Sequence, residues 1–178
     1  MYAIQSAQWF VLRTNYSREL KVMKQLADKN IQCFIPMKYK NIIKDEQRKR
    51  IKVPYIHNMV FVNIARNILD SFIAQSDFNC PVSYMKKNNS NEPIIIPQQE
   101  MNNFMLVAGC NQENLIFLND GIEKFAQSDQ VRVIGGLLEG LEGYVVRIRR
   151  DRKVVVSLQG VVAVAISGIH PSLLEKIH

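Results

Sequence analysis

The sequence predicts an α+β protein in two parts, an antiparallel sheet with helices followed by a small β-barrel. In residues 1–109, short apolar runs alternate with segments whose apolar residues recur every three or four positions. From residue 128 onward the apolar period changes to two, as in half-buried strands. Five of the eight glycines lie in or beside Val, Ile and Leu runs of this second part. We therefore expect a first domain over 1–109, a linker over 110–127 and a barrel over 128–178.

The first strand and helix follow from the opening residues. The run WFVLRT, Trp9 to Thr14, is short and apolar, which predicts a buried strand. Ser17 is expected to be the N-cap of a helix that ends at Asn30 in the left-handed conformation. The inward stripe of this helix is predicted to be Leu20, Met23, Leu26 and Ala27.

A long hairpin and two more helices complete the first domain. The segments QCFIPMKYKNII and RIKVPYIHNMVFVNI read as two long strands joined around residues 44–50. A helix over RNILDSFIAQS follows, then a strand in PVSYMKK and a helix after Pro97. The side chains expected to face inward in the middle helix are Ile68, Leu69, Phe72 and Ile73. The order β-α-β-β-α-β-α is typical of helices stacked on an antiparallel sheet, a ferredoxin-like α/β sandwich.

The second part reads as four or five short strands in about fifty residues, which bury their apolar face by curling into an SH3-like barrel. Val154, Val156 and Leu158 are expected to point inward. Gly135, Gly136 and Gly140 are expected to supply the backbone angles of sharp corners. Gly143 is expected where a close neighbour leaves no room for a side chain.

The charge is concentrated in the first part. The chain carries a formal net charge of +7, and residues 1–109 hold 15 basic and 8 acidic side chains. Five of the basic residues lie within nine positions of the hairpin connection, namely Lys44, Arg48, Lys49, Arg50 and Lys52. Such a run suits a loop that approaches phosphate groups, and it equally suits a solvated hairpin tip. Arg147, Arg149, Arg150 and Arg152 are similarly either a solvated face of the barrel or a strip that binds RNA or protein.

Two sets of motifs in order resemble a known family. The segment VRVIGGLLEGLEGYVVRIRRDRKVVVSLQG looks like a KOW motif, with Gly143 as its characteristic glycine. The segments WFVLRT, FIPMKYK, VPYIHNMVFVNI and PVSYM resemble the amino-terminal (NGN) domain of the NusG transcription factors in order and spacing. The chain is thus similar to NusG-like elongation and antitermination factors over nearly its whole length. Within that family it resembles the specialised, operon-specific antiterminator branch, the UpxY-like and RfaH-like paralogues.

The resemblance implies binding residues for RNA polymerase. In the family, an apolar depression on the first domain receives the clamp helices of the polymerase. The positions that match its border are Trp9, Phe10, Ile56, Asn58, Met59 and Phe61. The family usually has Phe-Pro-Gly-Tyr or Phe-Pro-Asn-Tyr in the second strand of the hairpin. This chain has Ile56-His57-Asn58-Met59 instead, so only Asn58 matches the signature. Some of these apolar residues are equally compatible with a purely structural place in the core.

The resemblance also implies further partners. The basic hairpin residues would lie toward upstream DNA, the non-template strand or nascent RNA. The KOW turn, with Gly140, Gly143, Gln159 and Gly160, would meet a ribosomal protein or the termination factor Rho. The family's Phe-Gly-Arg turn is Gln159-Gly160-Val161 in this chain, which has lost both flanking side chains.

Several functional classes are disfavoured. The sequence contains no P-loop, GxSxG, HExxH or paired Cys/His motif. We therefore expect that the protein is not an enzyme and that it has no metal site and no cofactor. It has no long apolar run or secretory signal, which predicts a cytoplasmic protein without membrane contact. Cys33, Cys80 and Cys110 are expected to be reduced thiols. The alternative function is a KOW protein that binds structured RNA or ribosomes without polymerase.

Overall fold

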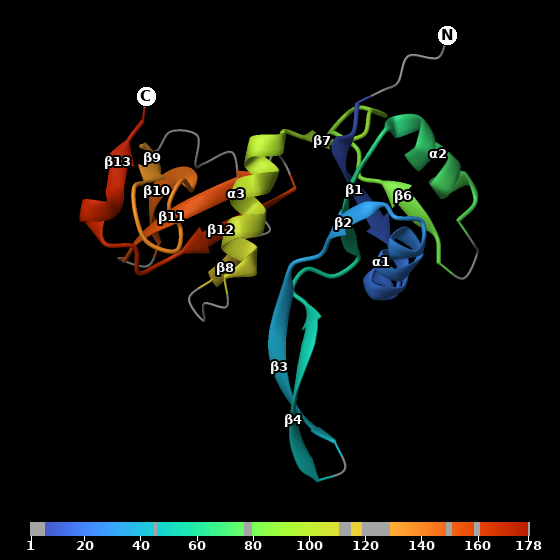
Figure 1. Ribbon diagram of the computed structural model, residues 1–178, viewed down its shortest axis with the longest axis horizontal. Coiled ribbons are helices and arrows are strands. Elements are labelled where there is room, and N and C mark those ends of the chain that lie inside the picture. The colour runs from blue at the N-terminus through green and yellow to red at the C-terminus, as the bar shows by residue number, and fades with distance from the viewer. Residues whose placement is uncertain are drawn as a thin grey trace. The chain divides into compact units, whose positions relative to one another are not determined.

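The computed structural model describes residues 6–44, 46–76, 80–110, 115–118, 129–148, 151–158 and 161–177 (Figure 1). These residues form two compact units, Met1–Pro97 and Gln98–His178. The expected architecture of an antiparallel sheet with helices, followed by an all-β region of antiparallel strands, is confirmed.

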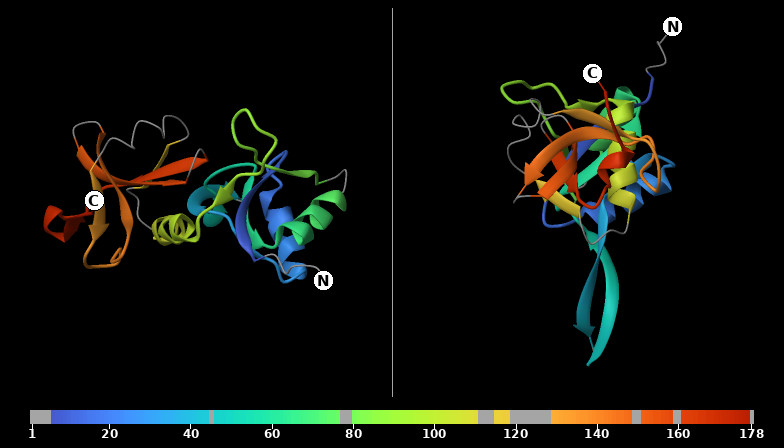
Figure 2. Two further views of the ribbon diagram at one scale, coloured as in Figure 1. Left: turned by 90° about the horizontal axis from the view of Figure 1, so that it is seen from above. Right: turned by 90° about the vertical axis from the view of Figure 1, so that its left-hand side faces the viewer.

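The first unit is built on a five-stranded antiparallel sheet. Its strands run in the order β2-β5-β1-β6, and β7 also pairs with β1. The bounds are β1 Gln8–Thr14, β2 Gln32–Phe34, β5 Met59–Ile64, β6 Val82–Tyr84 and β7 Ile95–Ile96. The helices α1 Glu19–Asp28 and α2 Arg66–Ala74 cover one face of this sheet (Figure 2). The core between sheet and helices includes Phe10, Leu12, Val22, Leu26, Val60, Val62, Leu69 and Phe72.

A separate two-stranded sheet projects from the first unit. Strands β3 Met37–Lys44 and β4 Gln47–Pro54 pair with each other and extend away from the five-stranded sheet (Figures 1 and 2). The two long strands expected from the sequence are therefore each interrupted, into β2 with β3 and into β4 with β5. Each break lies beside a proline, Pro36 or Pro54, which cannot donate a ladder hydrogen bond. The Tyr55 N–H donates to the Pro36 carbonyl at 2.7 Å and closes the base of the hairpin.

The helix faces differ in part from those expected. Val22 and Leu26 are buried in α1, whereas Leu20 is 42% exposed and Ala27 is exposed. In α2 Leu69 and Phe72 are buried, and Ile68 is 50% exposed. The predicted N-cap Ser17 is also wrong, since the cap position is Arg18 and Ser17 has a φ of 52°. Asn30 has a φ of 55°, as predicted.

The second unit is a six-stranded antiparallel sheet with a helix packed on it. The strand order is β13-β9-β10-β11-β12-β8. The bounds are β8 Leu115–Leu118, β9 Gln130–Val133, β10 Glu142–Ile148, β11 Asp151–Leu158, β12 Val162–Ile166 and β13 Leu174–Lys176, with a 3-10 helix over Pro171–Leu173. The helix α3, Gln98–Gly109, lies against β11 and β12. Val154, Val156 and Leu158 are buried as expected, but Lys153 and Val155 between them are buried as well, so β11 does not show the alternation of a half-buried strand.

The boundary between the two units differs from the expected one. Helix α3 was assigned to a first domain ending at residue 109, but it groups with the second unit, which begins at Gln98. The phenyl rings of Phe104 on α3 and Phe117 on β8 meet edge to face, with centroids 6.3 Å apart. Strand β8 lies inside the expected linker 110–127 and pairs with β12. Apart from β8 and Cys110, the linker lies outside the described residues.

The glycines of the second unit follow the prediction with one exception. Gly136 and Gly140 both have a φ of 83°, a left-handed conformation that side chains disfavour. A Cβ added at Gly143 would lie 2.7 Å from the Val155 carbonyl oxygen and 2.9 Å from Val154 Cγ1. Gly135 has neither a left-handed φ nor a close backbone neighbour, so its predicted role was wrong. Gln159 and Gly160 lie outside the described residues.

Candidate functional site

The sheet of the first unit has an apolar face opposite its helices. Trp9 and Val11 on β1 and Met59 and Phe61 on β5 share this face, because side chains two positions apart point to the same side of a strand. Phe34 on β2 is opposite Phe61, and the two rings lie 6.4 Å apart. Three of the six predicted polymerase-binding residues, Trp9, Met59 and Phe61, are thus brought together. We call this surface, defined by Trp9, Val11, Met59 and Phe61, the apolar sheet face.

The remaining predicted polymerase-binding residues are placed differently. Phe10 points to the other side of β1 and belongs to the helix-covered core, where it is fully buried. Ile56 and Asn58 lie in the loop between β4 and β5 and are half-buried. Trp9 is 1% exposed and Phe61 is not exposed at all, whereas Met59 is half-buried. Met59 is therefore the part of the apolar sheet face that is open to solvent. We call it, together with the half-buried Ile56 three positions before it in the chain, the accessible border.

Asn58 has a structural role in this loop. Its φ of 60° is left-handed, which asparagine tolerates better than most residues. Its Oδ1 accepts a hydrogen bond from the Ser17 N–H at 2.9 Å, and its carbonyl oxygen accepts one from the Thr14 N–H at 3.1 Å. Asn58 thereby ties the loop before β5 to the loop after β1.

The same two loops enclose a buried carboxylate that sequence reasoning missed. Glu19 is 1% exposed at the first turn of α1, where the helix dipole favours negative charge. Its Oε1 lies 3.2 Å from Nδ1 of His57, a largely exposed imidazole. Glu19 Oε2 and Thr14 Oγ1 are buried without a hydrogen-bond partner in the part of the chain that the structure describes. His57 is thus a surface residue that is hydrogen-bonded to a buried carboxylate.

The β3–β4 hairpin gathers much of the positive charge. Residues 37–54 contain seven basic and two acidic side chains. The strand register places Arg48, Arg50 and Lys52 on one face, opposite Ile43, Asn41 and Tyr39 respectively. The other face carries Lys38, Lys40 and Lys49, with Ile42, Ile51 and Val53. Lys44 is the last residue of β3, and its side chain lies outside what the structure describes.

The face that carries Arg48, Arg50 and Lys52, which we call the arginine face, also carries the aromatic ring of Tyr39. The Arg50 guanidinium carbon lies 4.1 Å from the centre of the Tyr39 ring, and Lys52 Nζ lies 6.0 Å from it. Tyr39 is 43% exposed and Ile43 near the tip is 78% exposed. Stacked guanidinium and phenol groups with neighbouring cations can bind both the bases and the phosphates of a nucleic acid strand.

Other kinds of site are not found among the described residues. No group of three or more His, Cys, Asp or Glu side chains could hold a metal ion there. Within the same ranges, no helix is long and apolar enough to cross a membrane. Cys33, Cys80 and Cys110 are free thiols, and burial raises the pKa of Cys33.

These features define a protein of two compact units, an α+β unit with a basic hairpin and an antiparallel β unit. A family model described as NusG, transcription termination factor nusG, matches residues 7–105, more than half of the chain. The chain therefore belongs to the NusG family of transcription factors.

Among solved structures, the chain is similar to one described as "Domain interaction in Thermotoga maritima NusG", with 20% identity and a TM-score of 0.49. That match covers 97% of this chain and 98% of the other. The comparison with curated proteins gives no match.

Proposed function

We propose that this chain is a transcription elongation and antitermination factor that binds RNA polymerase through its first unit. The observation that carries the proposal is the apolar sheet face, which brings Trp9, Met59 and Phe61 together opposite α1 and α2. An apolar surface of this kind suits the tips of two helices, as in the clamp of the polymerase. Membership of the NusG family supports the same partner.

Binding would proceed from the accessible border of this face. Ile56 and Met59 are half-buried and available to a partner, whereas Trp9 and Phe61 are buried. A partner can therefore contact Trp9 and Phe61 only after a conformational change exposes the apolar sheet face to solvent. The net gain therefore comes from the apolar surface of Ile56 and Met59 that binding removes from water, worth about 25 cal/mol per Å² before the costs of association.

The binding energy would act on the conformation of the polymerase. A factor attached to one wall of the main cleft and touching the other binds the closed cleft more tightly than the open one. Such differential affinity shifts the population toward the closed state. Pausing and termination would then compete less well with nucleotide addition.

The hairpin would add attraction for nucleic acid near the cleft. Arg48, Arg50 and Lys52, with Lys44 and Lys49, give a salt-sensitive and largely sequence-independent contribution. The arginine face, with Tyr39 under Arg50, favours unpaired bases of the non-template strand or nascent RNA. Upstream duplex DNA would be held through its phosphates alone.

The second unit would bring other partners to the polymerase in the cytoplasm. Its sequence Gln159-Gly160-Val161 lacks the aromatic and basic residues that relatives carry where they meet a ribosomal protein or Rho. This departure, together with the altered Ile56–Met59 signature, favours a specialised factor of the UpxY-like or RfaH-like branch. Such a factor would serve particular operons, for example surface-polysaccharide loci.

The substitution Ile56→Asp tests polymerase binding. It places a charge on the accessible border of the apolar sheet face, so affinity for purified RNA polymerase is expected to fall at least about tenfold. The free energy of unfolding should change by no more than about 1 kcal/mol, because Ile56 lies half-buried in a loop. Binding is measured by biolayer interferometry and stability by urea unfolding.

The matched control is Ile68→Asp on α2, an isoleucine that is 50% exposed on the helix side of the sheet. It should leave polymerase affinity within about twofold of the wild type. Equal losses for the two variants, or unfolding of the Ile56→Asp protein, would show that the apolar sheet face is not the polymerase site.

A further inference from the structure

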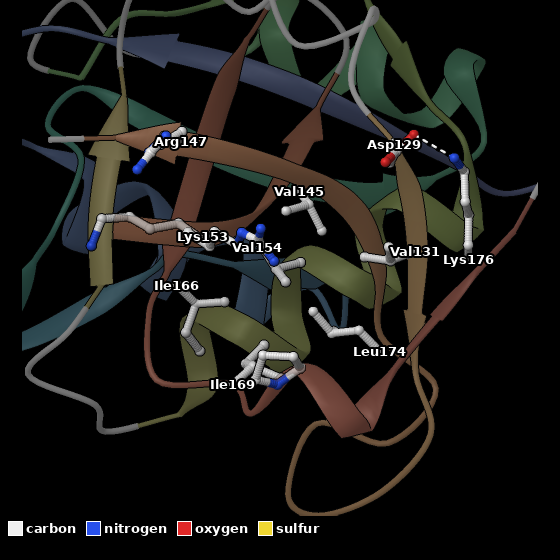
Figure 3. Close-up of a pocket in the computed structure, with 12 residues that line it drawn as sticks. Asp129, Val131, Val145, Arg147, Lys153, Val154, Ile166, Ile169, Leu174 and Lys176 are labelled. Carbon is white, nitrogen blue, oxygen red and sulfur yellow. Dashed lines mark ion pairs between the residues drawn. The ribbon is translucent and has the colours of Figure 1, made fainter. Parts of the chain in front are cut away.

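The second unit contains a cavity with an apolar floor, on the sheet formed by β9 to β13. Its volume is about 500 Å³. The aliphatic lining consists of Val131, Val145, Val154, Ile166, Ile169 and Leu174 (Figure 3). Val145, Ile169 and Leu174 are only partly buried in the free chain, so apolar surface remains open to a ligand.

The rim of this cavity is strongly basic. Four cationic side chains, Arg147, Arg152, Lys153 and Lys176, line it together with one carboxylate, Asp129. Lys176 Nζ lies 2.7 Å from Asp129 Oδ1, so this pair is neutralised (Figure 3). The other three cations form no ion pair with any carboxylate whose side chain the structure describes. The β10–β11 register places Arg147 and Arg152 on the face of Val145 and Val154, whereas Lys153 projects to the opposite face with Val146. The cavity therefore has an excess of two positive charges, from Arg147 and Arg152.

The arrangement of Arg147 and Arg152 is unfavourable for folding alone. The two arginines are directly opposite each other in the β10–β11 ladder, where like charges destabilise a sheet. An anionic ligand at the rim would remove this penalty.

The lining also determines the class of ligand. None of the lining residues is aromatic, so an unpaired base would find no stacking surface. A small inorganic anion would leave the aliphatic floor in contact with water. A ligand with aliphatic side chains flanked by carboxylates can cover the aliphatic floor and also pair with the cations of the rim.

We propose that this cavity binds a short acidic segment of a partner protein, with one or two aliphatic side chains inserted between Val145, Ile166 and Leu174. Carboxylates of the segment pair with Arg147 and Arg152. This site is distinct from the apolar sheet face, and its occupation does not depend on polymerase binding by the first unit.

The test uses the full chain and fluorescent peptides of about ten residues. The probe contains glutamates with two central leucines, and its two controls replace either the leucines by serine or the glutamates by glutamine. Fluorescence anisotropy should show the probe binding at least about tenfold more tightly than either control peptide. Equal binding of probe and serine control would overturn the proposal, because charge alone would then explain the attraction.

Charge reversal locates the site. Arg147→Glu with Arg152→Glu should weaken probe binding at least about tenfold. The matched control, Lys21→Glu with Lys24→Glu, changes the net charge equally on exposed positions of α1 and should have less than a twofold effect. Equal losses in the two double variants would overturn the proposal, and so would a single-stranded oligonucleotide that binds through the arginines where the peptide does not.

A single substitution separates a binding role from a structural one. Arg147→Glu replaces the like-charge pair with an opposite-charge pair across the ladder, so the Tm should equal or exceed that of the wild type while probe binding falls. A lower Tm would show that Arg147 stabilises the fold, and would contradict the proposal.

Discussion

Gly143 shows how a single residue can be predicted from the sequence. Its place at the start of a Val-rich strand indicated a position without room for a side chain, and the Val155 carbonyl oxygen occupies that room. Gly135 looked equivalent in the sequence but needs no special conformation. A run of two glycines does not reveal which of them adopts the left-handed angle.

Gly143→Ala should therefore destabilise the protein. The added methyl group would meet backbone at 2.7 Å, so β10 or β11 must shift, at an expected cost of about 1–3 kcal/mol. The free energy of unfolding is measured by urea titration with circular dichroism as the probe.

Gly109→Ala is the control for this substitution. Gly109 is the last residue of α3 and has no atom within 4 Å of an added Cβ, so alanine should be neutral or stabilising by up to about 1 kcal/mol. A Gly143→Ala protein as stable as the wild type would mean that the sheet adapts without strain.

Asn58 and Glu19 mark the limit of prediction at this scale. The sequence identified Asn58 through its match to a binding signature, yet its hydrogen bonds connect two loops of the unit itself. Glu19 gave no signal at all, because a charged residue beside a helix start is usually solvated. Only the fold brings residues 41 positions apart, such as Ser17 and Asn58, into hydrogen-bond contact.

At the level of elements, the helices were predicted but their faces were partly wrong. In α1 the stripe from Leu20 to Ala27 is displaced, because Glu19 and Val22 turn inward in their place. Apolar spacing alone cannot distinguish neighbouring stripes on a short helix, where one residue changes the face by 100°. The breaks at Pro36 and Pro54 could have been predicted, since proline is restricted to the edges and ends of strands.

The two faces of the β3–β4 hairpin allow a test of nucleic-acid binding at constant charge. Arg48→Ala, Arg50→Ala and Lys52→Ala together remove three charges from the arginine face, and Lys38→Ala, Lys40→Ala and Lys49→Ala remove three from the other. We expect the arginine-face variant to bind a single-stranded oligonucleotide about tenfold more weakly than the lysine-face variant, because it also loses the stacked Arg50.

Fluorescence anisotropy at several salt concentrations measures these affinities. Both variants should reduce the slope of log affinity against log salt concentration equally, by about two, because each loses three phosphate-binding charges. Indistinguishable affinities would show that the hairpin attracts nucleic acid through charge alone and that Tyr39 and Arg50 have no part in it.

For the molecule as a whole, the order of the two parts could be predicted and the boundary between them could not. The change of period after residue 128 correctly indicated the all-β region. Helix α3 and strand β8 precede that change, and nothing in their own sequence shows that they pack with strands far along the chain. The family match likewise runs to residue 105, inside α3.

The fragment 98–178 should consequently be more stable than the fragment 128–178. The shorter fragment lacks α3 and β8 and exposes the surface that they cover on β11 and β12, which should cost at least about 2 kcal/mol. Its remaining Val-rich strands should still give a β-type circular dichroism spectrum. Equal Tm values for the two fragments, or a helical spectrum for the shorter one, would contradict this expectation.

The independence of the β3–β4 hairpin has an evolutionary consequence. Its strands form a sheet of their own, and most of their side chains contribute nothing to the core of the first unit. Mutations there escape the selection that preserves folding. Related factors could therefore diverge in which strand or sequence they favour by changing this one appendage, while inheriting the same scaffold.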